Sequence, residues 1–288
     1  MLMPSINKSH LSPIAALLVM FTFTLLQGCK KDDEDTAPTL TGAWVQQASF
    51  DAPSRSRGVT FTIDNNVYLA TGFNGNNGNR FLNDLWVYDQ TIDTWKEKAS
   101  LPVEAKRSGA VAFSLNGKGY VGLGFNGSTY LKDFYRYDPA NDSWTKLNDF
   151  KGAARMGAVA FTINNVAYVG TGTNDDGSYK DFYSYDEAND AWVDRPAVPL
   201  TERSGAFAFV INNLGYVGGG TNGVLKVEDM YAYDPTTNSW TAKNNLKDDA
   251  DDQDTNDKGY AISRELAAVF VTGNNAYVVG GRIANGAG

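Results

Sequence analysis

Residues 107–144, RSGAVAFSLNGKGYVGLGFNGSTYLKDFYRYDPANDSW, form the unit that the rest of the chain repeats. Five residue types stand in it at fixed spacings, as Arg107, Phe113, Tyr120, Asp138 and Trp144. The same ladder of five residue types recurs at the same spacings as Arg155, Phe161, Tyr168, Asp186, Trp192 and as Arg203, Phe209, Tyr216, Asp234, Trp240. An earlier copy, Arg55, Phe61, Tyr68, Asp89, Trp95, has three extra residues between its Tyr and Asp. A fifth copy begins with Arg264, Phe270 and Tyr277. A dominant period of about 48 residues predicts a repeat architecture with one supersecondary unit per repeat.

The composition limits the class of protein and of partner. The chain has 288 residues, and each repeat is too small to bury its own apolar face, so we expect the repeats to pack into one domain. The net charge of −8 argues against a nucleic-acid partner, which would need clustered Lys and Arg. The single cysteine excludes a disulfide within the chain.

Each repeat predicts four short strands. In the unit above, residues 110–115 are apolar and rich in β-formers, Asn116-Gly117 is a two-residue hairpin signal, and residues 119–123 give a second strand. Residues 133–137 alternate, residues 138–142 form a turn, and residues 143–146 give the fourth strand. The sequence therefore predicts an all-β fold, a β-propeller with four antiparallel strands per blade. We call these strands a, b, c and d.

The repeats resemble the kelch motif. A β-rich strand ends in glycines, and a tyrosine follows later with a tryptophan seven positions after it. The tyrosine–tryptophan pairs are Tyr88/Trp95, Tyr137/Trp144, Tyr185/Trp192 and Tyr233/Trp240. The resemblance covers nearly everything after residue 40, although the kelch double glycine relaxes in three repeats. It implies a kelch β-propeller over residues 41–288, with repeats starting near 55, 107, 155, 203 and 264.

About five blades are visible, and the closure of the ring is open. Trp44 matches the tryptophan of strand d, so the N-terminal end can supply one strand of a blade that the C-terminal end begins. Strands a and b of the fifth repeat are expected around residues 266–271 and 276–280, without a strand c. Either the ring has five blades with one incomplete, or the sequence is a fragment of a six-bladed ring. We favour the fragment, because an open ring exposes unpaired strand edges.

The N-terminal segment predicts export and a lipid anchor. Residues 14–26 form an apolar run that is too short to span a bilayer, and Leu26-Gln27-Gly28-Cys29 follows. This end resembles the lipobox of bacterial lipoproteins, which implies a signal peptide over residues 1–28 and lipidation at Cys29. Residues 29–40 form an acidic tether, and Lys30-Lys31 followed by acids resembles a surface-export signal. We expect an outer-membrane lipoprotein exposed at the cell surface.

One face of the propeller carries the candidate binding residues. The b–c and d–a loops share this face and vary, and variable loops on a rigid scaffold are where recognition is usually placed. The face is expected to receive the arginine that opens each repeat and an asparagine six residues after each strand-b tyrosine. These candidates are Arg55, Arg107, Arg155, Arg203, Arg264, Asn74, Asn126, Asn174 and Asn222.

Each of these candidates has two interpretations. Guanidinium groups around the channel mouth would suit carboxylates, sulfates or phosphates, or each arginine simply bonds carbonyls of the next blade. The asparagines bind ligand or form turns. The loop aromatics Phe73, Phe81, Phe125, Tyr130 and Tyr179 stack on sugar faces or cover the blade tops. An acidic insertion at 248–257 is expected to be solvated.

The composition also excludes several chemistries. The only histidine, His10, lies in the signal peptide, so the copper oxidase site known on the kelch fold cannot be built, nor can Ser–His–Asp or Cys–His catalysis. No cofactor and no metal are expected. At fold level the chain also resembles bacterial kelch sialic-acid epimerases, which implies roles for Glu104, Glu202 and the arginines in proton transfer and carboxylate binding.

The sequence therefore favours a lipid-anchored binding module over an enzyme. Its expected ligand is a carbohydrate or a protein. The alternatives are a metal-independent sugar epimerase and a structural surface scaffold.

Overall fold

The computed structural model describes residues 45–76, 80–199, 201–246 and 263–282. The chain divides into two units, Met1–Gln46 and Gln47–Gly288, and nearly all described residues belong to the second. The predicted signal peptide, Cys29, the tether and the acidic insertion lie outside the described residues. Within the described ranges, no helix is long and apolar enough to cross a membrane.

Four antiparallel sheets follow one another along the second unit, each with four strands. The first sheet contains β1 (Val59–Ile63), β2 (Asn66–Asn74), β3 (Arg80–Asp89) and β4 (Thr94–Lys98). The second contains β5 (Val111–Leu115), β6 (Lys118–Gly122), β7 (Phe134–Asp138) and β8 (Ser143–Lys146). The third contains β9 (Val159–Ile163), β10 (Val166–Gly170), β13 (Phe182–Asp186) and β14 (Ala191–Arg195). The fourth contains β15 (Phe207–Ile211), β16 (Leu214–Gly218), β17 (Met230–Asp234) and β18 (Ser239–Ala242).

Three smaller elements complete the described chain. The fifth repeat gives a two-stranded sheet of β19 (Ala268–Thr272) and β20 (Asn275–Val279). A hairpin of β11 (Thr173–Asn174) and β12 (Gly177–Ser178) lies in the b–c loop of the third sheet. A single 3-10 turn, η1 (Val103–Ala105), lies between the first two sheets along the chain.

The sequence ladder corresponds to cross-strand pairs within each sheet. Phe113 of β5 lies opposite Tyr120 of β6, with stacked rings 4.9 Å apart. Tyr137 of β7 lies opposite Trp144 of β8, at 5.1 Å. Such aromatic pairs on one face of an antiparallel sheet stabilise the pairing, which accounts for the recurrence of these residue types.

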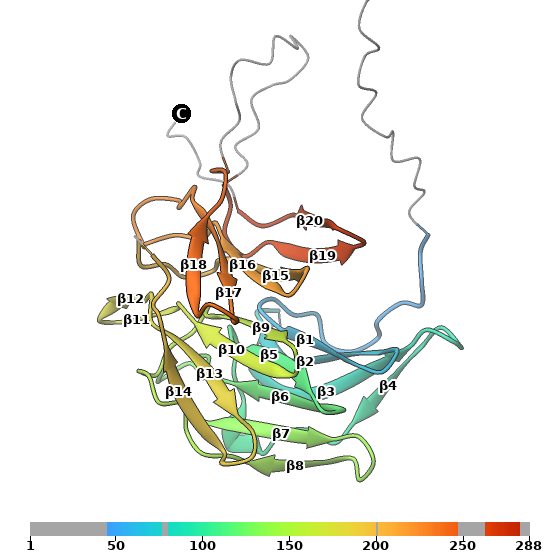
Figure 1. Ribbon diagram of the computed structural model, residues 1–288. Coiled ribbons are helices and arrows are strands. Elements are labelled where there is room, and N and C mark those ends of the chain that lie inside the picture. The colour runs from blue at the N-terminus through green and yellow to red at the C-terminus, as the bar shows by residue number, and fades with distance from the viewer. Residues whose placement is uncertain (1–44, 77–79, 200, 247–262, 283–288) are drawn as a thin grey trace, which may run out of the picture. The chain divides into compact units, whose positions relative to one another are not determined.

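The core lies between neighbouring sheets. One apolar cluster joins the first and second sheets, a second joins the second and third, and another joins the third and fourth. The innermost strands β1, β5, β9, β15 and β19 are neighbours in that order (Figure 1). Sheets that pack face to face, each with its own inner strand beside a common channel, form a β-propeller. The predicted all-β propeller fold is therefore confirmed, with four complete blades and a two-stranded fifth element among the described residues.

The fifth element is less covered than its counterparts. The side chain of Phe270 in β19 is 46% exposed, whereas the equivalent Phe61 in β1 is 5% exposed. Among the described residues, β20 pairs only with β19. Within the part of the chain that the structure describes, no neighbouring sheet covers Phe270 as the second sheet covers Phe61.

Candidate functional site

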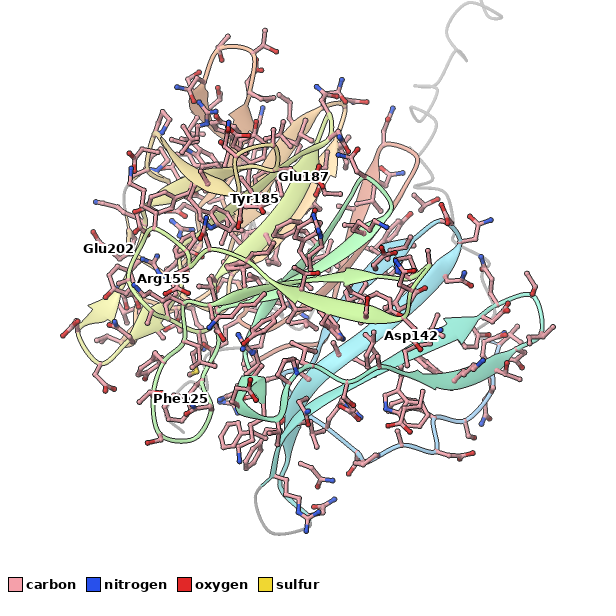
Figure 2. The ribbon with its side chains drawn as sticks, turned by 90° about the horizontal axis from the view of Figure 1, so that it is seen from below. Phe125, Asp142, Arg155, Tyr185, Glu187 and Glu202 are labelled. Carbon is pink, nitrogen blue, oxygen red and sulfur yellow. The ribbon has the colours of Figure 1, made fainter. Side chains whose placement is uncertain are left out.

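The two ends of the blades carry different chemistry. The a–b and c–d turns lie on one face, and the b–c and d–a connections lie on the other, which we call the mouth face. On the turn face, Glu187 accepts hydrogen bonds from Asn116 and from the Tyr120 hydroxyl, joining two blades. Figure 2 shows Phe125, Arg155 and Glu202 toward the mouth face, and Asp142 and Glu187 toward the turn face.

The repeat arginines are built into the blades. Arg107 is fully buried, and its guanidinium donates to the carbonyls of Ala105 at 2.7 Å and Leu123 at 3.0 Å. The same group binds both carboxylate oxygens of Asp133, at 2.8 and 3.0 Å. All of these acceptors belong to the second repeat itself, not to the next blade. Arg107 therefore connects the lead-in of β5, the end of β6 and the start of β7.

The other repeat arginines have the same kind of partner. Arg55 binds both oxygens of Asp84 at 2.7 and 2.6 Å, and the fully buried Arg155 binds both oxygens of Asp181. Arg203 is also fully buried and forms an ion pair with Asp229 at 2.5 Å, without the hydrogen-bond alignment of its counterparts. Arg264 donates to the carbonyl of Gly280 at 2.8 Å. These contacts agree with the structural interpretation of the arginines, and their role in ligand binding stays a prediction.

Sequence reasoning missed the carboxylates that hold these arginines. Each one opens an Asp-apolar-aromatic triplet, which lies at the start of strand c in three blades and within β3 in the first. The aspartates are Asp84, Asp133, Asp181 and Asp229. The last three follow their arginine by 26 residues, and Asp84 follows Arg55 by 29. This constant spacing is the signal that would have paired them.

The repeat asparagines cap turns in the b–c loops. Asn126 Oδ1 accepts the backbone N–H groups of Ser128 and Thr129, at 2.9 and 2.8 Å. Asn222 Oδ1 accepts those of Val224 and Leu225 in the same way. Asn74 and Asn174 each accept the N–H two residues ahead. These are the Asx turns expected of asparagine in loops, and a role in ligand binding stays a prediction for this set too.

A series of backbone hydrogen bonds surrounds the channel mouth. It passes through one residue per repeat, two positions after the repeat arginine. Gly109 N–H donates to the Arg57 carbonyl, Gly157 to Gly109, Gly205 to Gly157, and Leu266 to Gly205, at 2.7–3.0 Å. All five residues have a positive φ between 53° and 66°. Three repeats place glycine there, but the first places Arg57 and the fifth Leu266.

A second set of positions rims the same mouth and also differs between repeats. These residues lie near or just beyond the end of strand b and form isolated bridges to the residue after each repeat arginine. They are Phe73, Phe125, Thr173, Thr221 and Arg282. One side of the rim is therefore aromatic, and the fifth repeat adds a cation.

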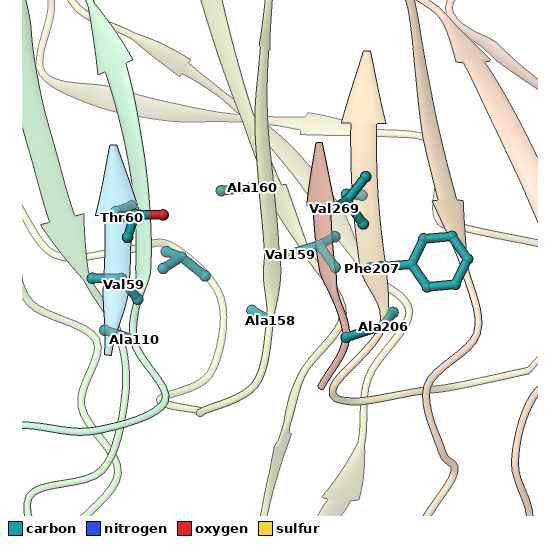
Figure 3. A pocket seen from close by; sticks show the side chains of 13 residues that line it. Val59, Thr60, Ala110, Ala158, Val159, Ala160, Ala206, Phe207 and Val269 are labelled. Carbon is teal, nitrogen blue, oxygen red and sulfur yellow. The ribbon is translucent and has the colours of Figure 1, made fainter. Parts of the chain in front are cut away.

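The inner strands enclose a channel below this rim. One part of it, about 220 Å³, is lined by Phe207 and by alanine, valine and threonine residues of β1, β5, β9, β15 and β19 and of the segments that precede these strands (Figure 3). Thr60 supplies the hydroxyl among the side chains labelled there. A wider cavity of about 960 Å³ continues to the mouth and is lined in addition by Arg57, Phe73 and Arg282. This size suits a small ligand.

Aromatic rings continue outward from the rim as a ledge, which consists of Phe73, Phe81, Phe125 and Tyr130. Successive rings lie 5.0, 5.9 and 5.0 Å apart, and all four are half-buried. Burial and the nearby Asp175 raise the pKa of Tyr130, and its hydroxyl donates a hydrogen bond to Asp175 at 3.2 Å. Tyr179 lies elsewhere, with its ring 4.0 Å from the guanidinium carbon of Arg155.

The residues that an epimerase would need do not gather at the cavity. Glu202 forms an ion pair with Lys180 at 3.0 Å, and Glu104 is exposed in η1. A hydrogen bond from its own backbone N–H, together with Lys180, lowers the pKa of Glu202, which opposes a role as a proton donor. Neither glutamate lines a cavity described above, so the epimerase alternative is not favoured. Within the described ranges, no group of three or more potential metal ligands occurs.

Comparisons with known proteins agree with this architecture. Residues 54–102 and 106–151 each match the Kelch motif. Among solved structures, that of YjhT is similar with a TM-score of 0.59 and 19% sequence identity, over 69% of this chain and 68% of that chain. At this identity the likeness shows the fold alone. No curated protein sequence matches the chain. The kelch-type propeller supports, at a coarse level, a function in binding a ligand or a protein.

Proposed function

We propose that this propeller is a binding module that holds a carbohydrate on its mouth face. The observation that carries the proposal is the contrast between scaffold and rim. The arginine–aspartate pairs and aromatic ladders recur from blade to blade, whereas the rim changes from phenylalanine to threonine to arginine. Variation confined to the loops of a regular scaffold is typical of recognition.

The chemistry of the ledge favours a sugar as the ligand. Half-buried aromatic rings offer a rigid apolar surface that can stack against the C–H face of a pyranose. The Tyr130 hydroxyl donates to Asp175 at 3.2 Å and can still accept a hydrogen bond from a sugar hydroxyl. The cavity below, about 960 Å³, provides room for a terminal residue of a glycan.

A glycan array tests this proposal. We expect binding that is lost in Phe125→Ala, because Phe125 contacts both Phe81 and Tyr130 within the ledge. The matched control is Phe270→Ala, which removes an exposed ring outside the mouth. Both variants are checked for folding by circular dichroism. Binding that survives Phe125→Ala, or the absence of any bound glycan, contradicts the proposal and leaves a protein partner or a scaffold.

We also propose that the propeller is anchored to the outer membrane through lipid on Cys29 and faces the cell exterior. The proposal rests on the apolar run and on the LQGC motif that follows it. Acyl chains stabilise membrane attachment in proportion to the CH₂ groups they bury. Cys29→Ser should move the protein from the membrane fraction to the soluble fraction and remove labelling by a fatty-acid analogue. Surface exposure is checked by protease treatment of intact cells. Unchanged membrane attachment in Cys29→Ser rules out the anchor.

A further inference from the structure

The backbone of Arg57 is in a conformation that arginine rarely adopts. Its φ is 53°, and the equivalent residues of the next three blades are glycines with φ of 62–66°. A side chain in the left-handed region is strained, whereas glycine is not. Strained residues are frequent at functional sites, so the strained backbone of Arg57 indicates that its side chain has a role in function.

The charge of Arg57 is uncompensated. It is exposed, and its guanidinium has no hydrogen bond or ion pair with any part of the chain that the structure describes. The repeat arginine two positions earlier, Arg55, is instead paired with Asp84. The cation at 57 is therefore available to a ligand.

Arg282 brings a second available cation to the same place. It occupies the rim position that Phe73 and Phe125 hold in the first two blades, and it is exposed and likewise unpaired within the described residues. Arg57 and Arg282 both line a cavity of about 140 Å³ and the larger one of about 960 Å³. Glu265 shares the smaller cavity, but its carboxylate forms an ion pair with Lys226 at 2.7 Å.

We propose that Arg57 and Arg282 form an anion-binding subsite at the channel mouth for the acid group of an acidic sugar, a carboxylate or a sulfate. This inference rests on the proposed function and names the ligand class. Guanidinium groups match the planar, paired oxygens of such groups. Phe73 lines the same cavity as both arginines, so one ligand can stack on the ledge and present its acid group to them.

The local charge also favours an anion. The chain as a whole carries −8, which repels anions at long range. Four of the repeat arginines, Arg55, Arg107, Arg155 and Arg203, are neutralised by aspartates, so Arg57 and Arg282 supply the positive charge that opposes this repulsion at the cavity. Binding should therefore weaken as ionic strength rises, because salt screens exposed charges.

Titration calorimetry with matched sugars tests the subsite. The probes are D-glucuronate, glucose 6-sulfate and neutral D-glucose, and comparison of the first two distinguishes carboxylate from sulfate. We expect at least one acidic probe to bind tighter than glucose. Arg57→Gln and Arg282→Gln should each weaken its binding about ten-fold to one-hundred-fold, as expected for loss of a charge-assisted hydrogen bond. Arg80→Gln is the control, because Arg80 is an exposed arginine at the start of β3 that lines neither cavity.

A second variant separates binding from folding. Arg57→Gly supplies the residue that the other blades use, so it should leave the melting temperature unchanged or higher while it weakens binding as much as Arg57→Gln. Equal affinity for acidic and neutral probes, no binding of either acidic probe, or equal effects of Arg57→Gln and Arg80→Gln would each overturn the subsite. If neutral glycans still bind and Phe125→Ala abolishes that binding, the proposed carbohydrate-binding function stands and only the anion subsite is wrong.

Discussion

Arg107 connects three strands of its own blade. It forms hydrogen bonds with Ala105 in the segment before β5, with Leu123 just after β6 and with Asp133 just before β7. The group is fully buried, so its charge depends on the carboxylate for compensation. The recurrence of arginine and aspartate in the first four repeats is therefore explained by their structural role within each blade.

Breaking one of these pairs should destabilise the protein strongly. Asp133→Asn leaves the Arg107 guanidinium buried without a counter-charge, and we expect a loss of about 3 kcal/mol in the free energy of unfolding. Urea titration followed by tryptophan fluorescence measures it. The control is Asp194→Asn, whose partner Lys151 is exposed, and it should cost less than about 1 kcal/mol. Similar losses in both variants would show that burial does not matter here.

The sequence did not show which arginines are structural and which are available to a ligand. The repeat arginines and Asp133, Asp181 and Asp229 recur with the same period, and their constant offset of 26 residues is the pairing signal that was missed. Burial decides whether a guanidinium can bind a ligand or serves only the scaffold. The period of a sequence repeat does not predict the burial of a side chain. Arg57 and Arg282 were overlooked because they depart from the repeat, and only the register of the strands shows that they meet at one cavity.

In the first three blades, an aspartate of the c–d turn links the blade to the segment of chain that precedes it. Asp142 accepts hydrogen bonds from the Tyr137 hydroxyl at 2.7 Å and from the Ala99 N–H, just after β4, at 2.9 Å. Asp93 and Asp190 do the same in the first and third blades. In the fourth blade Asn238 accepts from Tyr233 at 2.7 Å. Charge is therefore dispensable for this tyrosine bond.

The charge of Asp142 should make the second blade sensitive to acid. Burial alone would raise the pKa of Asp142. The hydrogen bonds from Ala99 and Tyr137 and the charge of Lys98 together lower it by more than burial raises it, so the pKa lies below its ordinary value. A lowered pKa in the folded state gives stability that is present above about pH 4 and is lost as pH falls through the folded pKa. Asp142→Asn should therefore lose less stability than wild type between pH 5 and pH 3, as measured by thermal unfolding. Asn238→Asp is the reciprocal control and should lose more.

Close packing between sheets depends on a missing side chain at Gly119 in β6. A Cβ atom there would lie 2.1 Å from the ring of Phe61 in the neighbouring blade. Phe61 is 5% exposed and stacked on Tyr68, so it has little room to move. We expect Gly119→Ala to lower the unfolding free energy by about 1–3 kcal/mol in urea titrations. Gly75→Ala, in an open loop, controls for the backbone effect of alanine, and an equal loss there would refute the packing explanation.

Most strands were predictable because hairpin chemistry is local. The expected strand 143–146 coincides with β8, and Asn116 and Gly117 adopt the positive φ values, 48° and 69°, that their turn requires. The first blade differs because its b–c loop is longer by three residues. There β2 and β3 continue past a bulge after Ala70 and pair again from Gly72 to Asn74. The longer loop in the sequence predicts that the first blade differs at this face. Only the structure shows that the extra residues extend the pairing of β2 with β3 and place Phe73 opposite Phe81.

Two series of hydrogen bonds connect the blades along the mouth. One runs through Gly109, Gly157 and Gly205, and the other joins the end of each strand b to the carbonyl of the next repeat arginine, as in Gly124 to Arg155 at 2.7 Å. Repeat proteins gain most of their stability from such nearest-neighbour interfaces. The period in the sequence was sufficient to predict this architecture, because each blade is defined by contacts to copies of itself. The asymmetric site was not predictable, because it depends on which blades differ.

The fifth element should be the least stable part of the described propeller. Phe270 and Val279 are 46% and 45% exposed, and β19 and β20 form only a two-stranded sheet, which has marginal stability on its own. Opening free energies vary within one protein with such differences in burial, so amides of β19–β20 should exchange with solvent at least about 100-fold faster than those of β9–β10. Hydrogen exchange with mass spectrometry measures both hairpins in the same sample, and the matched residues Phe161 and Phe270 provide the internal control. Equal protection of the two hairpins would mean that the exposed face is covered in solution, and would contradict the packing described for the fifth repeat.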